Sequence, residues 1–229
     1  MAWLLAVVSV PGSAFFQVRR LEVTGARVLS PDAVAAVAGI ASGRPLITVR
    51  PADAQARLQA HPRISAARVR VRWPDAVEIE VTERIPRVAV GSGGQFALVG
   101  DDGIVVAVAA DPAGLPVVDD RVAPPQVLVP GARVATGAVR AALGALDALP
   151  APMAARLARV VVREGGDVAM AFAPDLVVRA TLREDLPDRL ARLPEMLEAL
   201  VARGIVPRIV DLRYAGSLVV VPVRGGDVR

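Results

Sequence analysis

The sequence of 229 residues contains no cysteine and only one histidine, His61. Without cysteine the chain has no disulfide, no thiolate nucleophile and no cysteine-based zinc site. A single histidine leaves a catalytic triad or a histidine-based metal site without the partners that it needs. We therefore expect neither catalytic residues nor a metal site, and we place His61 at a helix end, in the segment QAHPR.

Aromatic residues and lysine are also scarce. Phe, Trp and Tyr make up 3% of the chain against 54% hydrophobic residues, so the core must consist mainly of Val, Ala and Leu. The chain also lacks the aromatic platforms on which single-stranded nucleic acid stacks. All 27 basic residues are Arg, and they are scattered along a chain of net charge +4. We expect no nucleic-acid partner, and weak attraction to anionic lipid or cell-wall polymer fits this charge better.

The first 16 residues, MAWLLAVVSVPGSAFF, carry no charged side chain. As a helix they would reach roughly 24 Å, short of the ~30 Å hydrocarbon core of a bilayer. We interpret them as a partial transmembrane segment, with a signal peptide or a buried strand as the alternatives. Arg19 and Arg20 follow the apolar run and no basic residue precedes it, which is opposite to the pattern of a cytoplasmic N-terminus. We therefore expect a cytoplasmic tail upstream of this sequence.

Residues 17–85 predict one domain that contains both helices and strands. A strand over residues 16–24 is followed by a helix over residues 30–39, which has Ser as N-cap, Pro in the first turn and Gly as stop. A second helix over residues 51–62 begins and ends at Pro, and a hairpin over residues 67–84 follows. The predicted order is strand, helix, helix, strand, strand, with the helices on one face of the sheet.

The hairpin segment, ARVRVRWPDAVEIEVTER, alternates apolar and polar residues in both halves. This alternation predicts one buried face and one solvent-exposed face that carries an Arg–Glu ladder. A loop of Pro74-Asp75-Ala76 pairs Arg72 with Glu78 and Arg70 with Glu80. Each such pair contributes about 0.2–1 kcal/mol, so the ladder fixes register and indicates no catalytic role.

From Arg87 the sequence becomes strand-rich, and we place a domain boundary near Pro86. Residues 86–229 predict a mixed β-sheet domain with two helices, residues 136–149 and 187–203. Pro194 lies inside the second helix and predicts a kink there. Asp101-Asp102-Gly103 is a hairpin turn rather than a calcium loop, because the later ligands of such a loop are missing.

Segments of both domains resemble the FtsQ/DivIB family of bacterial division proteins. LEVTGARVLSPDAVAAVAGI, Arg44-Pro45-Leu46 and HPRISAARVRVRWPDAVEIEVTERIPRVAV resemble the POTRA domain of that family. FALVGDDGIVV, RLARLPEML and IVDLRYAGSLVV are similar to landmarks of its β domain. The order and spacing of these segments carry the resemblance. The sequence departs from the family pattern in two places. The usual cytoplasmic tail and full-length span are not in it, and Leu182-Arg183 stands where family members often have a Leu-Gly turn before the helix.

The resemblance implies an α+β fold made of a partial transmembrane segment (1–16), a POTRA domain (17–85) and an FtsQ-type β domain (86–229). It implies a single-pass protein of the cell inner membrane with both domains outside the cytoplasm. The implied function is that of a divisome scaffold, not an enzyme and without a cofactor, which links early and late division proteins. Such a scaffold binds the coiled-coil partners FtsB and FtsL and helps regulate septal peptidoglycan synthesis.

The last strand offers a site for such a partner. The segment LVVVPV is apolar on both faces, and the polar tail RGGDVR follows it. An edge strand without charges is a template for pairing with another chain. The predicted partner-binding residues are Tyr214, Ala215, Gly216, Ser217, Leu218, Val219, Val220 and Val221, with Ser217–Val221 accepting the strand and Tyr214 and Leu218 selecting side chains. Burial under the chain's own helices is the competing interpretation, and Asp211 and Arg213 are either partner contacts or a structural pair.

Two other classes of function stay open. POTRA patterns also occur in envelope assembly and transport systems, so a chaperone or substrate-binding module of that kind is the alternative. A soluble hydrolase is the enzymatic alternative. No nucleophile–base pair and no pair of carboxylates at catalytic spacing supports a hydrolase.

Overall fold

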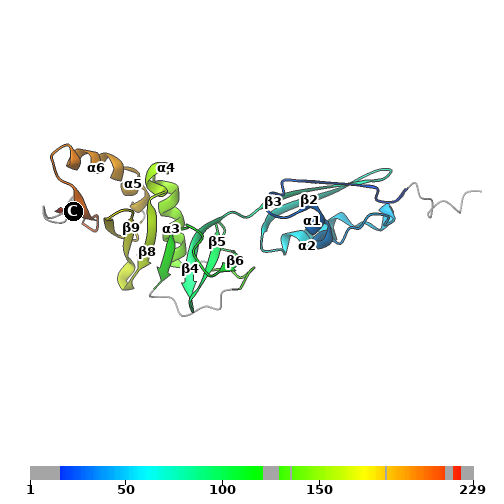
Figure 1. Ribbon diagram of the computed structural model, residues 1–229, viewed down its shortest axis with the longest axis horizontal. Helices are drawn as coiled ribbons and strands as arrows, with labels where there is room; N and C mark the ends of the chain where they lie inside the picture. The colour runs from blue at the N-terminus through cyan, green and yellow to red at the C-terminus, as the bar shows by residue number, and fades with distance from the viewer. Residues whose placement is uncertain (1–15, 121–128, 135, 184, 215–218, 223–229) are drawn as a thin grey trace, which may run out of the picture. The chain divides into compact units, whose positions relative to one another are not determined.

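The computed structural model of the protein describes residues 16–120, 129–134, 136–183, 185–214 and 219–222. The chain divides into two compact units, Met1–Ile85 and Pro86–Arg229, each with its own sheet (Figure 1). Except for Phe16, the membrane segment predicted over residues 1–16 lies outside the described residues. Among the described residues, no helix is long and apolar enough to cross a bilayer.

The first unit has the order strand, helix, helix, strand, strand, as the sequence predicts. Its elements are β1 (Arg20–Thr24), α1 (Pro31–Ala38), the short 3-10 helix η2 (Leu46–Thr48), α2 (Pro51–Gln59), β2 (Ile64–Arg72) and β3 (Ala76–Glu83). β3 is the middle strand, parallel to β1 and antiparallel to β2. The core between helices and sheet includes Val34, Leu58 and Ile79, each at most 1% exposed. The first strand is shorter than the predicted span of 16–24.

Local sequence signals set both ends of α1. The Ser30 hydroxyl accepts a hydrogen bond from the Ala33 amide at 3.1 Å, and Pro31 occupies the first turn. Gly39 ends the helix with φ 69°, a left-handed conformation that glycine adopts without strain. The predicted N-cap and the predicted stop are therefore both confirmed.

The β2–β3 hairpin has the predicted faces but not the predicted register. The apolar residues Val69, Val77, Ile79 and Val81 are buried, while Arg68, Arg70, Arg72 and Glu80 are exposed. In the ladder Arg70 lies opposite Glu78, whereas the sequence alone pairs it with Glu80. The shift of two residues keeps every side chain on its predicted face, and the predicted contact between Arg72 and Glu78 still forms, at 2.9 Å. The sequence alone also places Ala76 in the loop. Instead Ala76 is 5% exposed and pairs with Arg20, the first residue of β1. Because β1 pairs with it, Ala76 belongs to the sheet, and the turn consists of Trp73-Pro74-Asp75.

The carboxylate of Glu83, at the end of β3, holds the loop that precedes α1. It accepts hydrogen bonds from the backbone amides of residues 27–29 at 2.9 to 3.1 Å. Burial opposes the charge of this carboxylate, but the three amides and the nearby Arg63 outweigh burial, so the pKa of Glu83 is lowered. The ionised side chain thereby ties the last strand of the first unit to the start of its first helix.

The second unit is a mixed sheet of nine strands in the order β12-β11-β10-β9-β8-β7-β4-β5-β6. Its strands are β4 (Pro86–Ser92), β5 (Gln95–Gly100), β6 (Val105–Ala109), β7 (Val117–Asp120), β8 (Leu157–Val162), β9 (Asp167–Phe172), β10 (Leu176–Thr181), β11 (Pro207–Asp211) and β12 (Val219–Pro222). Its helices are α3 (Gly137–Ala148), α4 (Ala151–Ala154), α5 (Leu186–Ala191) and α6 (Leu193–Val201), with the 3-10 turn η3 (Glu164–Gly166). A mixed sheet is what the sequence predicts for this part of the chain.

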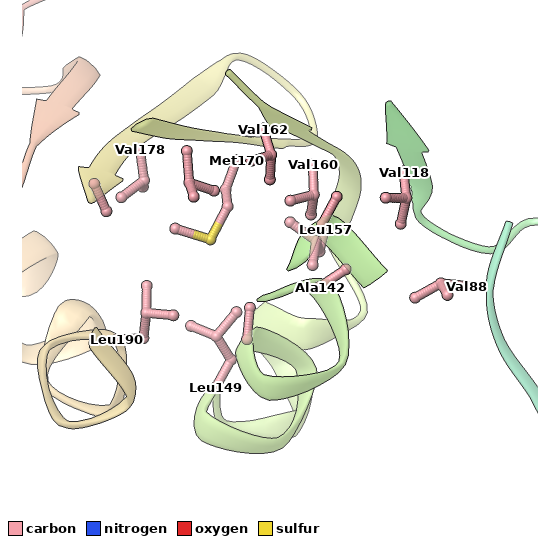
Figure 2. Close-up of a cluster of buried hydrophobic side chains, with 14 of the residues drawn as sticks. Val88, Val118, Ala142, Leu149, Leu157, Val160, Val162, Met170, Val178 and Leu190 are labelled. Atoms are coloured by element: carbon pink, nitrogen blue, oxygen red, sulfur yellow. The ribbon is translucent and has the colours of Figure 1, made fainter. Parts of the chain in front are cut away.

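Helices cover one face of this sheet and form the core with it. Figure 2 shows Val160, Met170 and Val178 pointing from the strands toward the helices, while Leu149 and Leu190 lie on the helical side. Met170, Val178 and Leu190 are completely buried. Because aromatic residues are so few, aliphatic side chains on alternate strand positions build the core, as the composition predicts.

The helix predicted over residues 187–203 is in fact two helices, α5 and α6, which meet at Arg192. Pro194 lies in the first turn of α6, where its missing amide removes no intrahelical hydrogen bond. A new helix start accommodates this proline better than a kink does. With α3 and the single-turn α4, the described residues of this unit therefore contain four α-helices instead of the predicted two.

We predict that Glu83→Gln weakens the first unit locally. The substitution keeps the side-chain size but removes the charge and turns one acceptor oxygen into a donor. The expected loss is about 1–3 kcal/mol, the range for hydrogen bonds to a charged group. Hydrogen exchange at the amides of residues 27–29 should become roughly tenfold faster or more. Glu80→Gln is the matched control on the same strand, since its exposed carboxylate lies 3.9 Å from Arg68 and should matter little.

The pH dependence of this contact has a definite sign. Because the folded-state pKa of Glu83 is lowered, its contribution is complete above the unfolded-state value of about 4.3. It is lost as the pH falls through the folded-state pKa. Equal exchange rates in Glu83→Gln and the parent protein at neutral pH would contradict the role given to this carboxylate.

Candidate functional site

Strand β12 lies at one end of the nine-stranded sheet. It pairs antiparallel with β11 through Asp211↔Val219, Val210↔Val220 and Ile209↔Val221. Within the described part of the chain, no strand pairs with its other side. In the described sheet β12 is therefore an edge strand, and the helices that cover the sheet face do not replace the missing neighbour.

Hydrogen-bond direction identifies the backbone groups that point away from the sheet. The Leu212 amide donates to the Arg179 carbonyl of β10 at 2.7 Å. Along a strand, successive residues direct their backbone groups to opposite sides, so Ile209 and Asp211 face β12 while Val210 faces β10. Val220, opposite Val210, consequently directs its N–H and C=O away from β11 to the free edge.

At the opposite end of the sheet, another segment of the chain bonds to the start of the outer strand. In β6 the Val105 amide donates to the Ala132 carbonyl at 2.9 Å, and the Gly131 amide donates to the Val105 carbonyl at 2.8 Å. A third bond runs from the Val134 amide to the Gly103 carbonyl at 2.7 Å. The two ends of the sheet thus differ, since only the β6 end has a described segment bonded to part of its outer edge.

Exposed apolar side chains gather around β12. Val219 and Val221, which share one face of the strand, are each 48% exposed, and Tyr214 is 55% exposed. Residues 219–222 include no charged residue, whereas charges protect the exposed face of the β2–β3 hairpin. A strand edge that combines free backbone groups with apolar side chains is suited to pairing with an additional strand.

A compact ion-pair network fixes the end of β11 beside this edge. Arg213 donates from Nε and Nη2 to the Asp211 carboxylate at 3.0 and 2.7 Å, and from Nη1 to Asp167 of β9 at 3.2 Å. Asp211 is only 6% exposed. Hydrogen bonds from Arg213 outweigh burial and lower the pKa of Asp211, and the same pairing raises the pKa of Arg213. Of the two interpretations of this pair, the structural one fits these contacts.

Residues distant in sequence hold the start of the loop that leads to β12. Arg189 of α5 donates from Nη2 to the Tyr214 carbonyl at 3.0 Å and lies 3.7 Å from Asp185. The Arg213 guanidinium also lies over the Tyr214 ring, 5.9 Å from its centroid. Sequence reasoning singles out neither Arg189 nor Asp167. These contacts span 25 and 46 residues, and no local pattern signals them.

The structure places only part of the predicted site. Tyr214 and Val219–Val221 are described: Val219–Val221 belong to the edge strand β12, and Tyr214 follows β11 at the start of the loop that leads to β12. Ala215, Gly216, Ser217 and Leu218 lie outside the described residues, so the proposed selection of side chains by Leu218 stays a prediction. In the described part of the chain, no group of three or more His, Asp or Glu side chains is close enough to hold a metal ion. The His61 ring accepts a hydrogen bond from the Arg63 amide at 3.3 Å.

Comparison with known families matches the two units in turn. Residues 16–84 match the POTRA domain, FtsQ-type, and residues 87–213 match the C-terminal domain of cell division protein FtsQ/DivIB. The class of protein is therefore a POTRA domain followed by a division-protein β domain, and neither matching description is that of an enzyme. The chain belongs to the FtsQ/DivIB family of cell division proteins. The matched range ends at Arg213, so residues 214–221 lie just beyond it.

Individual relatives agree with this assignment. The chain is 34% identical to cell division protein FtsQ of Streptomyces collinus, over 75% of this chain and 58% of that protein. It is 31% identical to FtsQ of Chloroflexus aurantiacus, over 88% of this chain and 72% of that protein. With FtsQ of Mycolicibacterium smegmatis the identity is 28%, over 70% of this chain and 45% of that protein. The matches to the Streptomyces and Mycolicibacterium proteins span less than two thirds of their lengths.

We predict that Asp211→Asn loosens the end of β11. The change leaves Arg213 without its closest carboxylate partner and should cost about 1–3 kcal/mol, as for other hydrogen bonds to charged groups. Exchange of the Leu212 amide, which bonds to β10, should become about tenfold faster or more. Arg208→Gln is the control, since Arg208 is exposed on the same strand. An unchanged Leu212 exchange rate in Asp211→Asn would refute the anchoring role.

Proposed function

We propose that this protein is a membrane-attached scaffold of the cell-division machinery that binds FtsB-like and FtsL-like coiled-coil proteins by strand addition at β12. Membership of the FtsQ/DivIB family supports a role in division. The uncharged, mainly apolar residues 1–16 support attachment to the inner membrane by a single segment. Membership of the FtsQ/DivIB family supports placing both domains outside the cytoplasm. The scaffold links early and late division proteins and helps regulate septal peptidoglycan synthesis through its partners, without catalysing a reaction itself.

The observation that carries this proposal is the outward direction of the Val220 backbone on an edge strand. An added strand gains main-chain hydrogen bonds there without disturbing the bonds between β11 and β12. Val219 and Val221 offer apolar contact on one face of the sheet. Backbone bonds then supply much of the affinity, while Tyr214 and its neighbours supply selectivity.

The position of the anchors supports rigid presentation of this edge. Asp211, which lies opposite Val219 in the ladder, is held by Arg213, and Tyr214 is held by Arg189. A strand that is already ordered costs less conformational entropy on binding than one that must fold against its partner. The helix-covered core behind β9 and β10 supplies the rigid support for both anchors.

We predict that Val220→Pro weakens binding of the FtsB-like protein about tenfold or more, because proline removes the outward amide and places its ring at the free edge. Val220→Thr keeps the amide and the β-branched shape, and it should bind almost as well as the parent chain. The measurement is isothermal titration of the full chain in detergent with the purified FtsB-like protein of the same organism. Hydrogen exchange of the Leu212 amide reports whether β11 stays intact in each variant.

Two results would count against strand addition. One is unchanged affinity in a Val220→Pro variant whose β11 exchange is normal. The other is equal loss of affinity in Val220→Pro and Val220→Thr, which would assign the effect to the side chain. A third result would point to a different partner. If the parent chain forms dimers and Val220→Pro abolishes them without changing the affinity for the FtsB-like protein, the edge pairs with a second copy of the chain.

A further inference from the structure

One end of the first unit carries a second surface, remote in sequence from β12. Phe16, the first described residue, packs edge-on against Trp73 with ring centroids 5.7 Å apart. The Val18 amide donates to the Arg44 carbonyl at 2.9 Å, and the Gly43 amide donates to the Val18 carbonyl at 2.8 Å. The β2–β3 turn and the segment before η2 therefore lie at the end of this unit where the described chain begins (Figure 1).

A concave pocket of about 490 Å³ lies next to this segment and is lined by the residues that follow α1, by η2 and by α2. Three arginines line it, Arg44, Arg50 and Arg57, and we call it the arginine pocket. Asp53 is the one carboxylate among its lining residues. The pocket wall thus has a net positive charge.

Backbone carbonyls hold two of these arginines in place. Arg44 donates from Nη1 to the Gly39 carbonyl at 2.9 Å and from Nε to the Thr48 hydroxyl at 2.9 Å. Arg57 donates from Nε to the Ala38 carbonyl at 3.1 Å. Carbonyl groups orient a guanidinium but carry no net charge to neutralise it.

The positive charge of the pocket is poorly compensated within the described residues. Neither Arg44 nor Arg57 forms an ion pair there, and Arg50, whose side chain is 83% exposed, approaches Asp53 only to 4.0 Å. Cations clustered on a concave wall raise the local potential and attract an anion. Arginine also presents several N–H donors in a plane, a geometry that suits phosphate oxygens.

Two exposed apolar side chains accompany this charge, one on the pocket wall and one on the β2–β3 turn, which contacts Phe16. Ile47, on η2, is 72% exposed, and Trp73 is 60% exposed. Indole rings and arginines together are typical of protein surfaces at the boundary between water and lipid. The residues that precede Phe16 are uncharged and mainly apolar, so the chain enters this end from its most hydrophobic segment. We name the arginine pocket, Ile47 and Trp73 together the tip surface.

We propose that the tip surface binds an anionic phospholipid bilayer, with headgroup phosphates in the arginine pocket and with Trp73 and Ile47 inserted at the interface. The inference rests on the membrane attachment through residues 1–16 that is part of the proposed function. The tip surface would be a second contact with the membrane, in addition to the attachment through residues 1–16. The first unit is then held against the bilayer surface instead of moving freely on a tether.

Tryptophan fluorescence tests this proposal, because Trp3→Phe leaves Trp73 as the only one of the two tryptophans. The full chain is reconstituted into phosphatidylcholine vesicles with or without phosphatidylglycerol. We expect a blue-shifted Trp73 emission and quenching by brominated lipid in the anionic vesicles. Changing all three arginines of the pocket to Gln should weaken the quenching several-fold, and high salt should do the same because it screens the headgroups.

Two further variants sharpen the test. The triple change of Arg159, Arg192 and Arg203 to Gln alters the net charge equally but affects exposed positions of the second unit, so quenching should persist. Ile47→Ser changes an exposed side chain outside the core and should also reduce quenching. Its effect does not depend on whether the triple pocket variant folds.

The outcomes separate this inference from the proposed function. If the chain floats with the vesicles but Trp73 is not quenched, the tip surface does not bind lipid and membrane attachment stands. If the chain does not float with either kind of vesicle, membrane attachment itself fails and this inference fails with it. Equal quenching in neutral and anionic vesicles would overturn the assignment of the arginine pocket to headgroup phosphates. Binding of the FtsB-like protein, measured separately, tests the β12 edge.

Discussion

An open β-sheet has two ends, and the backbone N–H and C=O groups along each outer strand need partners. In the second unit this constraint is met differently at the two ends. At the β6 end, residues 131–134 of the same chain bond to residues 103–105, where the strand begins. At the β12 end no described residue bonds to the outer side of the strand, although the neighbouring β11 contributes Val210 to the helix-covered core. Helices can bury the face of a sheet, but they cannot supply the hydrogen bonds of a missing strand. The difference between the ends is what makes one of them a candidate binding site.

Much of this arrangement could be predicted from the sequence, because short-range patterns decide it. The N-cap at Ser30, the stop at Gly39 and the buried face of the β2–β3 hairpin each follow from residues within one turn or one strand. The hairpin register could not be predicted in the same way. Alternation with period two fixes which face a side chain occupies, but it fits equally well after a shift of two residues. The parallel pairing of β1 with β3 brings Ala76 into the sheet, and that pairing joins residues far apart in the chain.

In the candidate site, too, short-range features could be predicted from the sequence and contacts between distant residues could not. The uncharged, apolar character of residues 218–221 is visible in the sequence and predicts an edge strand with a tendency to pair. Its anchors are not visible, because Arg189 and Asp167 reach β11 and Tyr214 only through the fold. Residues 131–134, which bond to the start of β6, likewise form no recognisable motif. The sequence alone could therefore identify the strand, but it could not show which residues hold that strand in place or which segment bonds to the start of β6.

The same side chain, arginine, acts in three ways in this protein, and the acceptor it meets decides which. On the exposed hairpin face, Arg72 meets the Glu78 carboxylate at 2.9 Å and helps to fix the pairing of the two strands. Beside the buried Asp211, Arg213 is neutralised and fixes β11. In the arginine pocket, Arg44 and Arg57 meet carbonyl oxygens, which orient the guanidinium groups but leave their charge available. A chain without lysine has only guanidinium groups for all three purposes, so composition alone cannot distinguish them. The distinction requires the acceptors, and it separates the part of the surface that stabilises the fold from the part that is free to bind.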